Sequence, residues 1–223
     1  MHHCRYCSIL GCYCYCYCWQ EYHVSYQVGE WLLHCLKLQF LWFYWVLRYG
    51  IFLGIFPATA TIIQAFFDSF QKKGRPAALK SWFRTVVKKN FRRANQLGAM
   101  QVGLLLFLWL ELRISSTFIQ NSLIHFFLLL LFISALLISL YLLPVYLRYD
   151  LTLLHYFKQA VILMVISVPQ TIAMILGILV TTIILTFLPI LLVIGFVPFF
   201  LFPNSWFSFQ AIQRSESLLK KET

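Results

Sequence analysis

The sequence predicts an all-α, polytopic membrane protein, and three observations support this class. Of the 223 residues, 61% are hydrophobic and only 11% are charged, whereas a soluble domain normally carries about 25% charged residues. Several apolar stretches approach the roughly 20 residues that a helix needs to cross a bilayer. None of them alternates polar and apolar residues between turns, as the strands of a membrane barrel do. The chain is therefore expected to be solvated by lipid, through helices.

About five transmembrane helices are expected from the positions of the apolar stretches. The predicted spans cover about 31–56, 97–112, 123–146, 171–188 and 189–212. The last of them is interrupted by Gly195, Pro198 and Pro203. A helix interrupted in this way can expose backbone groups to a solute, but proline kinks are also common in packed membrane helices.

The distribution of lysine and arginine predicts the orientation of the spans. The loop between the first two spans, residues 64–96, is dense in cations: Lys72, Lys73, Arg75, Lys80, Arg84, Lys88, Lys89, Arg92 and Arg93. Loops of this kind are retained on the cytoplasmic side of a membrane. With five spans, the N-terminus is then expected outside, and the tail at residues 214–223 is expected in the cytoplasm.

An amphipathic basic helix is expected within this cytoplasmic loop. Apolar residues recur there at spacings of three and four, the period of a helix: Leu79, Trp82, Phe83, Val86, Val87, Phe91 and Ala94. The other face carries Lys80, Arg84, Lys88, Lys89, Arg92 and Arg93. Such a helix would lie in the headgroup layer, with its aromatic residues in the acyl chains and its cations near anionic lipid headgroups. Two alternatives stay open, namely a helix that packs under the bundle and holds the topology, and a docking surface for a partner.

Two short motifs give the chain a resemblance to a known family. The first is "GIFPATAT", from Gly54 to Thr61, and the second is "SWFRTVVKKNFRRANQLG", which leads into the second predicted span. This pair resembles the YesL-like family of small bacterial integral membrane proteins. The matching positions are Gly54, Pro57, Ala58, Thr59, Phe83, Lys88, Asn90, Phe91, Ala94, Asn95 and Gly98. "YLLPVYLRYD", from Tyr141 to Asp150, resembles the next landmark of that family.

The resemblance implies a location and only an outline of a function. It covers about Gly29 to Lys220, and we place the membrane domain at residues 29–213. It implies the bacterial cytoplasmic membrane, a domain of unknown function, and an association with carbohydrate uptake or utilisation. A carbohydrate permease or another membrane protein is the implied partner. From the residues themselves, Pro57 disfavours helical geometry at Phe56, so the first motif is expected to form a turn where the chain leaves the bilayer.

The segment at residues 1–28 departs from this family and is rich in cysteine and tyrosine. Its cysteines are Cys4, Cys7, Cys12, Cys14, Cys16 and Cys18. Cys4 and Cys7 have the two-residue spacing typical of a zinc site, whereas the cysteines from Cys12 to Cys18 alternate strictly with tyrosine in low-complexity sequence. Disulfides are the other reading if this segment lies outside the cell. We expect no metal or cofactor here, and we expect much of the segment to be translated sequence upstream of the natural start.

Several classes of function are disfavoured by the sequence. Nucleic-acid binding needs a polar domain to carry the charge, and the chain has none of useful size. An enzyme is the least expected class, because the histidines stand alone and no acidic residue lies in the middle of a predicted span. A non-enzymatic accessory or scaffold protein is the favoured reading. The alternative is a small-solute transporter or channel, supported by the interrupted last span and by the polar residues that lie beyond its breaks, Asn204, Ser205 and Gln210.

Overall fold

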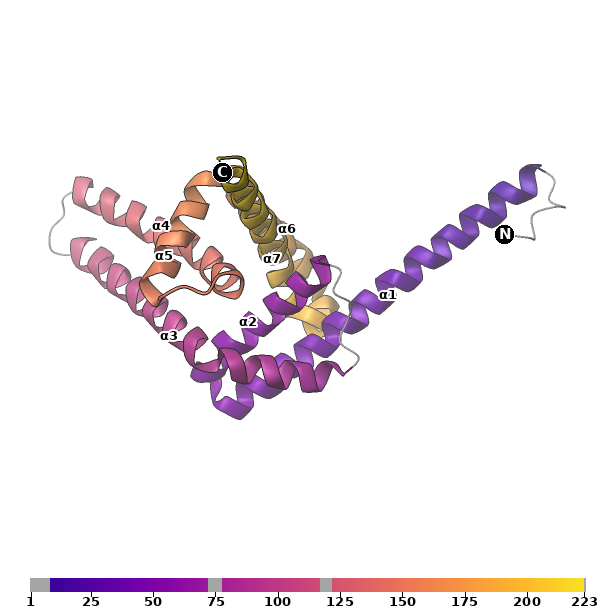
Figure 1. Ribbon diagram of the computed structural model, residues 1–223, viewed down its shortest axis with the longest axis horizontal. Helices are drawn as coiled ribbons and strands as arrows, with labels where there is room; N and C mark the ends of the chain where they lie inside the picture. Colours follow the sequence, from indigo (N-terminus) through magenta and orange to yellow (C-terminus); the bar gives the residue numbers. More distant parts are fainter. Residues whose placement is uncertain (1–8, 72–77, 117–121, 223) are drawn as a thin grey trace.

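Every regular element in the described part of the chain is helical, as the sequence predicts. The computed structural model of the protein describes residues 9–71, 78–116 and 122–222, with side chains at 29–71, 78–116, 122–193 and 195–217 (Figure 1). The helices are α1 (Ile9–Tyr49), α2 (Ile51–Phe70), α3 (Leu79–Ile114), α4 (Ser122–Arg148), α5 (Leu153–Ile166), α6 (Val168–Phe187) and α7 (Pro189–Glu222). Cys4 and Cys7 lie outside the described residues, and the predictions on the side chains of Cys12 to Cys18 fall outside them too.

Four helices are long and apolar enough to cross a membrane, so the protein is an all-α polytopic membrane protein. These helices are α2, α3, α4 and α6, and the apolar helix α5 is shorter. The predicted spans at 97–112, 123–146 and 171–188 correspond to parts of α3, α4 and α6. The predicted last span at 189–212 lies in α7, which is not among the four.

The predicted first span is divided at Gly50, where α1 ends and α2 begins. Gly50 has a φ of 82°, a left-handed conformation that glycine adopts without the steric cost of a Cβ atom. The two helices then run antiparallel. Gly54 packs on the backbone of Val46, and Trp42 Nε1 donates a hydrogen bond of 3.2 Å to Thr59 Oγ1. Chain reversal therefore occurs before the first motif.

The prediction that the first motif forms a turn is wrong. Pro57 lies inside α2 and is buried, and the helix continues through it to Phe70. Thr61 Oγ1 donates a hydrogen bond of 2.7 Å to the carbonyl oxygen of Pro57, one turn earlier in the same helix. Packing of α2 against its neighbours outweighs the local preference of the residue before a proline.

The basic helix and the second predicted span form one continuous helix, α3. Its first half packs against α2, and the ring of Phe56 lies against Gly98. Its second half pairs with α4, where Gln101 Nε2 donates a buried hydrogen bond of 2.9 Å to the carbonyl oxygen of Ala135. Beyond that contact, α3 and α4 expose large apolar side chains such as Phe107 and Phe126, as expected of surfaces that face lipid.

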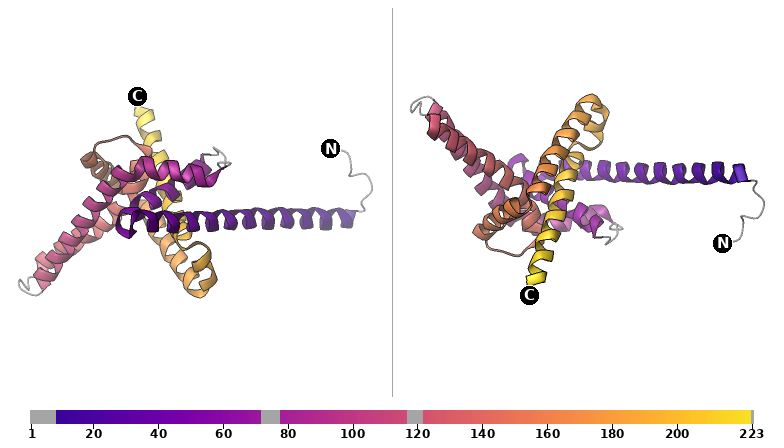
Figure 2. Two further views of the ribbon diagram at one scale, coloured as in Figure 1. Left: turned by 90° about the horizontal axis from the view of Figure 1, so that it is seen from below. Right: turned by 90° about the horizontal axis from the view of Figure 1, so that it is seen from above.

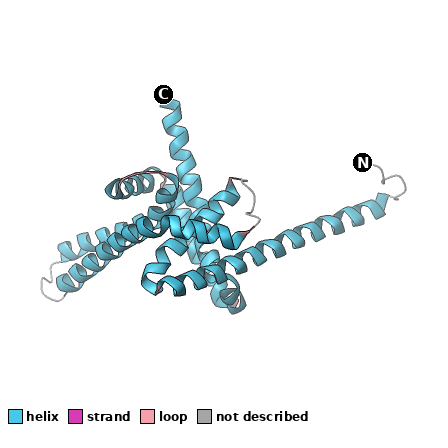
Figure 3. Ribbon diagram, turned by 60° about the horizontal axis from the view of Figure 1, so that its bottom comes forward, coloured by secondary structure: helices cyan, strands magenta, loops and turns pink. Residues whose placement is uncertain are grey.

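The α3–α4 and α6–α7 hairpins project toward the same side of the molecule, as both views in Figure 2 show. The C-terminus lies on the opposite side in the same views, and α1 extends away from the bundle (Figure 1). Figure 3 shows this splayed arrangement with helices throughout the described part. Two apolar clusters hold the helices together, one around Tyr141, Tyr156 and Leu97 and one around Leu38, Ile62 and Phe83.

Candidate functional site

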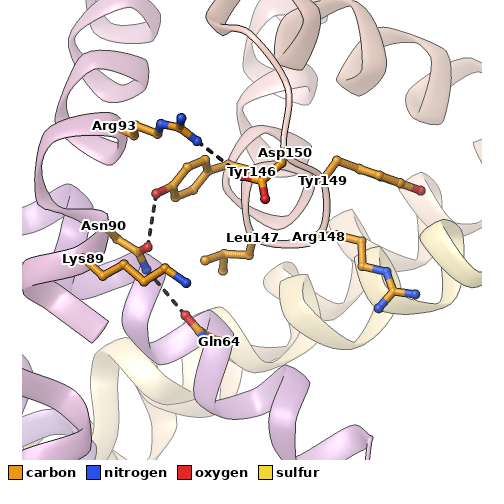
Figure 4. A pocket seen from close by; sticks show the side chains of 9 residues that line it. All are labelled: Gln64, Lys89, Asn90, Arg93, Tyr146, Leu147, Arg148, Tyr149 and Asp150. Atoms are coloured by element: carbon orange, nitrogen blue, oxygen red, sulfur yellow. Dashed lines mark hydrogen bonds and ion pairs between the residues drawn. The ribbon is translucent and has the colours of Figure 1, made fainter. Parts of the chain in front are cut away.

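A polar pocket of about 260 Å³ lies where α2, α3 and the end of α4 meet. Figure 4 shows the side chains that line it, and they come from all three helices and from the two residues that follow α4. The lining residues are Gln64, Lys89, Asn90, Arg93, Tyr146, Leu147, Arg148, Tyr149 and Asp150. Three cations and one carboxylate thus surround a group of uncharged hydrogen-bonding side chains.

Asn90 connects the three helices beneath the pocket. It is 6% exposed, and a buried amide needs partners for both its oxygen and its nitrogen. Tyr146 Oη donates to Asn90 Oδ1 at 3.1 Å, and Asn90 Nδ2 donates to Gln64 Oε1 at 3.4 Å (Figure 4). The polar floor of the pocket is therefore held in one geometry by α2 and α4.

The charged residues of the pocket differ in how strongly they are held. Arg148 makes a bidentate contact with Glu216 of α7, at 2.8 and 2.9 Å. Those hydrogen bonds hold the pKa of the Glu216 carboxyl below its ordinary value. Arg93 makes one contact of 3.3 Å with Asp150, whose side chain is 100% exposed. Burial, in turn, raises the pKa of the Tyr149 phenol.

A second, mostly apolar pocket adjoins the first. Its volume is about 600 Å³. Its lining residues are Arg93, Gln96, Met100, Leu151, Thr152, Leu153, Leu154 and Tyr156. Arg93 borders both pockets. The two cavities therefore place cationic groups and an apolar surface side by side.

The predicted cations form two rows on α3. All six are exposed. We call the row with four-residue spacing, Lys80, Arg84, Lys88 and Arg92, the outer ridge. In the part of the chain that the structure describes, no side chain forms an ion pair with a member of this ridge. Lys89 and Arg93 form the second row and line the polar pocket.

The aromatic residues of the basic helix do not all face outward. Phe83 is fully buried against α1 and α2, and Trp82 is half-buried beside the same cluster. The expectation that these aromatic residues enter the acyl chains is therefore wrong for Phe83. The apolar face of this half of α3 is already covered by protein.

Most residues of the two motifs serve packing between α1, α2 and α3. Ala58 and Ala94 are fully buried, and the ring of Phe91 lies 4.7 Å from that of Tyr49. The other packing positions described above are Gly54, Pro57, Thr59, Phe83 and Gly98. Asn90 is the one motif residue, apart from the cations, that lines the polar pocket. Asn95 has a buried amide whose oxygen and nitrogen have no hydrogen-bond partner among the described residues.

The sequence reasoning missed the partners of Asn90 and Arg148. Tyr146, Arg148 and Asp150 belong to the "YLLPVYLRYD" stretch, so the clustering of polar residues there was the available signal. Gln64 and Glu216 carry no such signal, because only tertiary packing brings Gln64 to Asn90 and Glu216 to Arg148.

A second group of polar residues lies at the interruption of α7. The helix loses its geometry at Gly195, with φ −168° and ψ 40°, whereas Pro198 and Pro203 lie within helical turns. The backbone N–H of Val197 donates to buried Gln39 Oε1 on α1 at 3.0 Å. Farther along α7, nine and ten residues beyond Gly195, buried Asn204 Oδ1 and Ser205 Oγ have no partner among the described residues.

Part of the chain matches the model of a known protein family. Residues 35–112 match the family model described as "Protein of unknown function, DUF624". This segment holds α2 and nearly all of α3, with both short motifs and the cations of the basic helix. No curated protein and no solved structure matches the chain. Among the described residues, no group of three or more His, Cys, Asp or Glu side chains is placed to hold a metal ion.

Proposed function

We propose that the protein is a non-enzymatic accessory or scaffold component of a membrane, which docks an acidic surface of a partner protein on the outer ridge of α3. The observation that carries this proposal is the ridge itself. Four exposed cations follow one line of a rigid helix, and no described side chain neutralises them. Charge of this kind attracts and orients acidic partners.

The burial of α3 favours docking over insertion as an anchor. A helix that anchors itself in a membrane surface needs a free apolar face. Here the apolar face of the basic half of α3 already packs against α1 and α2, since Phe83 and Val87 are fully buried. The cations are left facing outward, where they are available to a protein partner or to anionic headgroups.

The proposed location is the bacterial cytoplasmic membrane, with the outer ridge and the C-terminal tail in the cytoplasm and the N-terminus outside. The charge of the basic segment supports the inner location, and the length of α1, which extends away from the bundle (Figure 1), allows a remote N-terminus. Protease protection of tags placed at the two ends in intact cells tests this orientation. Digestion of a C-terminal tag by external protease would contradict it.

Site-specific photo-crosslinking in native membranes tests the docking proposal. A probe at Lys88 sits on the outer ridge, and a matched probe at exposed Val102 sits on the apolar half of the same helix. A discrete protein adduct from Lys88 and lipid adducts from Val102 are expected. The adduct should disappear when Arg84 and Arg92 are both changed to Glu. Lipid adducts alone at both positions would refute the docking role.

The link to carbohydrate uptake is the finer part of the proposal, and the resemblance to the YesL-like family supports it. Deletion of the gene is expected to slow growth on a subset of sugars as sole carbon source. The wild-type chain should restore growth, whereas a chain with the outer ridge changed to Glu should not. Equal growth of the deletion strain and its parent on every sugar would separate the protein from carbohydrate uptake.

The second candidate function is transport of a small polar solute, and one observation favours it. Asn204 and Ser205 place unpartnered polar atoms in the interior of the bundle, about two and a half turns of α7 beyond the Gly195 break. One contact argues against transport. The backbone N–H of Val197, which the break leaves without a helical partner, already donates to Gln39 Oε1 and is not available to a solute. Uptake by liposomes that contain the purified protein, compared with an Asn204→Ala variant, distinguishes the two functions, because only a transporter loses uptake with that change.

A further inference from the structure

The face of α3 that borders the two pockets begins with the two cations of the second row and continues with less polar residues. Lys89, Arg93, Gln96 and Met100 follow one another at spacings of three and four, so they lie along one face of the helix. The first two line the polar pocket and the last two line the apolar pocket. Cations precede this face on α3 and exposed apolar residues follow it. The face thus lies where the helix changes from a polar to an apolar environment.

The cations of the polar pocket are available to an anion. Lys89 is exposed and has no ion-pair partner in the described ranges. Arg93 contacts Asp150 through a single hydrogen bond of 3.3 Å, and that carboxylate is fully exposed. Exposed pairs of this kind contribute little free energy, so an incoming anion can displace Asp150 from the guanidinium.

The apolar pocket supplies the complementary surface directly beside these cations. It is bounded by Met100 from α3 and by Leu151, Leu153 and Leu154 from the segment that connects α4 to α5 and begins α5. Leu154 is 72% exposed, which is unfavourable in water and favourable against an acyl chain. A ligand that fills both pockets must therefore be amphiphilic, with an anionic group and an alkyl group joined within a few atoms.

We infer that these two pockets together bind one anionic membrane phospholipid, with its phosphate between Lys89 and Arg93 and the start of an acyl chain on Met100 and Leu154. Basic pockets beside membrane helices bind phosphate headgroups in this way, and arginine matches the geometry of a phosphate. No member of the outer ridge lines either of these two pockets, so this lipid site is separate from the proposed docking surface. A bound lipid would then join α3 to the α4–α5 connection.

Binding of phosphatidylglycerol to the full-length protein in a neutral detergent, measured by native mass spectrometry, tests the inference. Phosphatidylcholine serves as the zwitterionic reference lipid. The wild-type protein is expected to retain one phosphatidylglycerol at concentrations where it retains no phosphatidylcholine. Changing Lys89 and Arg93 to Gln should weaken phosphatidylglycerol binding roughly 30-fold, because each cation near a membrane surface contributes about 1 kcal/mol. Equal retention by this variant would overturn the site.

Two further variants separate a site from nonspecific charge. Lys80→Gln with Arg84→Gln removes the same charge from the outer ridge and should leave lipid binding unchanged, so an equal loss would show attraction by net charge alone. Asp150→Asn removes the competitor for Arg93 and should tighten binding, an effect that a purely structural role of Arg93 does not produce. Lys89→Arg with Arg93→Lys keeps the charge and should retain the lipid. Loss of binding in that variant despite unchanged helicity would count against phosphate recognition.

Inorganic phosphate distinguishes a lipid from a free anion as the source of the phosphate group. Millimolar inorganic phosphate should compete weakly with phosphatidylglycerol, because it lacks the contact with the apolar pocket. Leu154→Ser should weaken lipid binding without changing the effect of inorganic phosphate. If inorganic phosphate displaced the lipid completely, and Leu154→Ser had no effect, the site would bind a soluble phosphate and the lipid assignment would be wrong.

Discussion

Gly54 on α2 lies so close to the backbone of Val46 on α1 that a Cβ atom at position 54 would be 2.6 Å from Val46 Cα. Carbon atoms cannot approach to that distance without a shift of the two helices. The contact lies a few residues from Gly50, where the chain reverses. The α1–α2 hairpin therefore depends on a residue without a side chain at position 54.

Gly54→Ala is expected to lower the free energy of unfolding by about 1–3 kcal/mol, as overpacking in a filled interior does. The midpoint of thermal unfolding in detergent, followed by circular dichroism, measures the change. Gly103→Ala is the matched control, because nothing lies within 4 Å of a Cβ atom there. That control should be neutral or stabilise α3 by up to about 1 kcal/mol. Equal midpoints for the two variants would mean that α1 and α2 are not in tight contact.

The hydrogen bond between Tyr146 and Asn90 should appear as a coupling energy in a double-mutant cycle. Asn90→Ala, Tyr146→Phe and the double variant are expected to give a coupling of about 0.5–1.5 kcal/mol, since each single change leaves a buried polar group without its partner. Tyr44→Phe is the control, because among the described residues the Tyr44 hydroxyl accepts a single hydrogen bond, of 3.4 Å, from exposed Arg48. A cycle with no coupling would contradict the role of Asn90 as the link between α3 and α4.

The ion pair between Arg148 and Glu216 predicts a dependence of stability on pH. Because hydrogen bonds from Arg148 lower the pKa of Glu216, the unfolded state takes up its proton at a higher pH than the folded state. The stabilisation is therefore complete above the ordinary pKa and is lost as the pH falls through the lowered value. Glu216→Gln should cost about 1 kcal/mol or less at neutral pH, since the pair is partly exposed.

This difference between the wild type and Glu216→Gln should shrink progressively as the pH falls below about 4.5, the ordinary pKa of a glutamate carboxyl. Unfolding midpoints measured between pH 3 and pH 8 check the prediction. Asp150→Asn is the control, because its fully exposed carboxylate should leave the midpoint unchanged across this range. A difference that persists at the acid end would show that Glu216 acts through packing rather than charge.

Gln39 should stabilise the interruption of α7. Gln39→Leu removes the acceptor for the buried N–H of Val197, and leaving such a donor unpaired costs about 1–3 kcal/mol. Gln210→Leu, at an exposed position of the same helix α7, should have little effect on the unfolding midpoint. If Gln39→Leu unfolded at the wild-type temperature, the interruption would be stable without its contact to α1.

The sequence predicted the fold class and the position of three membrane helices, because length and hydropathy are local properties of the chain. It failed at the first span. Pro57 looked like the end of a helix, but packing on α1 and the bond from Thr61 keep it within α2. The chain instead reverses at Gly50, between α1 and α2. A hydropathy pattern cannot reveal the left-handed backbone conformation of that glycine.

The candidate site was predicted only in part, for a related reason. The cations of α3 were visible as a charge pattern, and Asn90 was visible as a motif residue. Their partners were not, because Tyr146 lies 56 residues from Asn90 and Asp150 lies 57 residues from Arg93. The interruption of the last span was expected from Gly195, Pro198 and Pro203, but only Gly195 leaves helical geometry.

The continuity of α3 has a mechanical consequence. Its 36 residues, at 1.5 Å each, give the helix a contour length of about 54 Å, which is longer than a bilayer's hydrocarbon core is thick. One half carries the cations and the other carries lipid-facing apolar residues, with no break between them. A partner docked on the outer ridge, as proposed above, would therefore exert a torque on the membrane hairpin when it pulls on the ridge. Because the same helix forms both parts, a change in bilayer thickness that tilts the α3–α4 hairpin would also move the outer ridge relative to a docked partner.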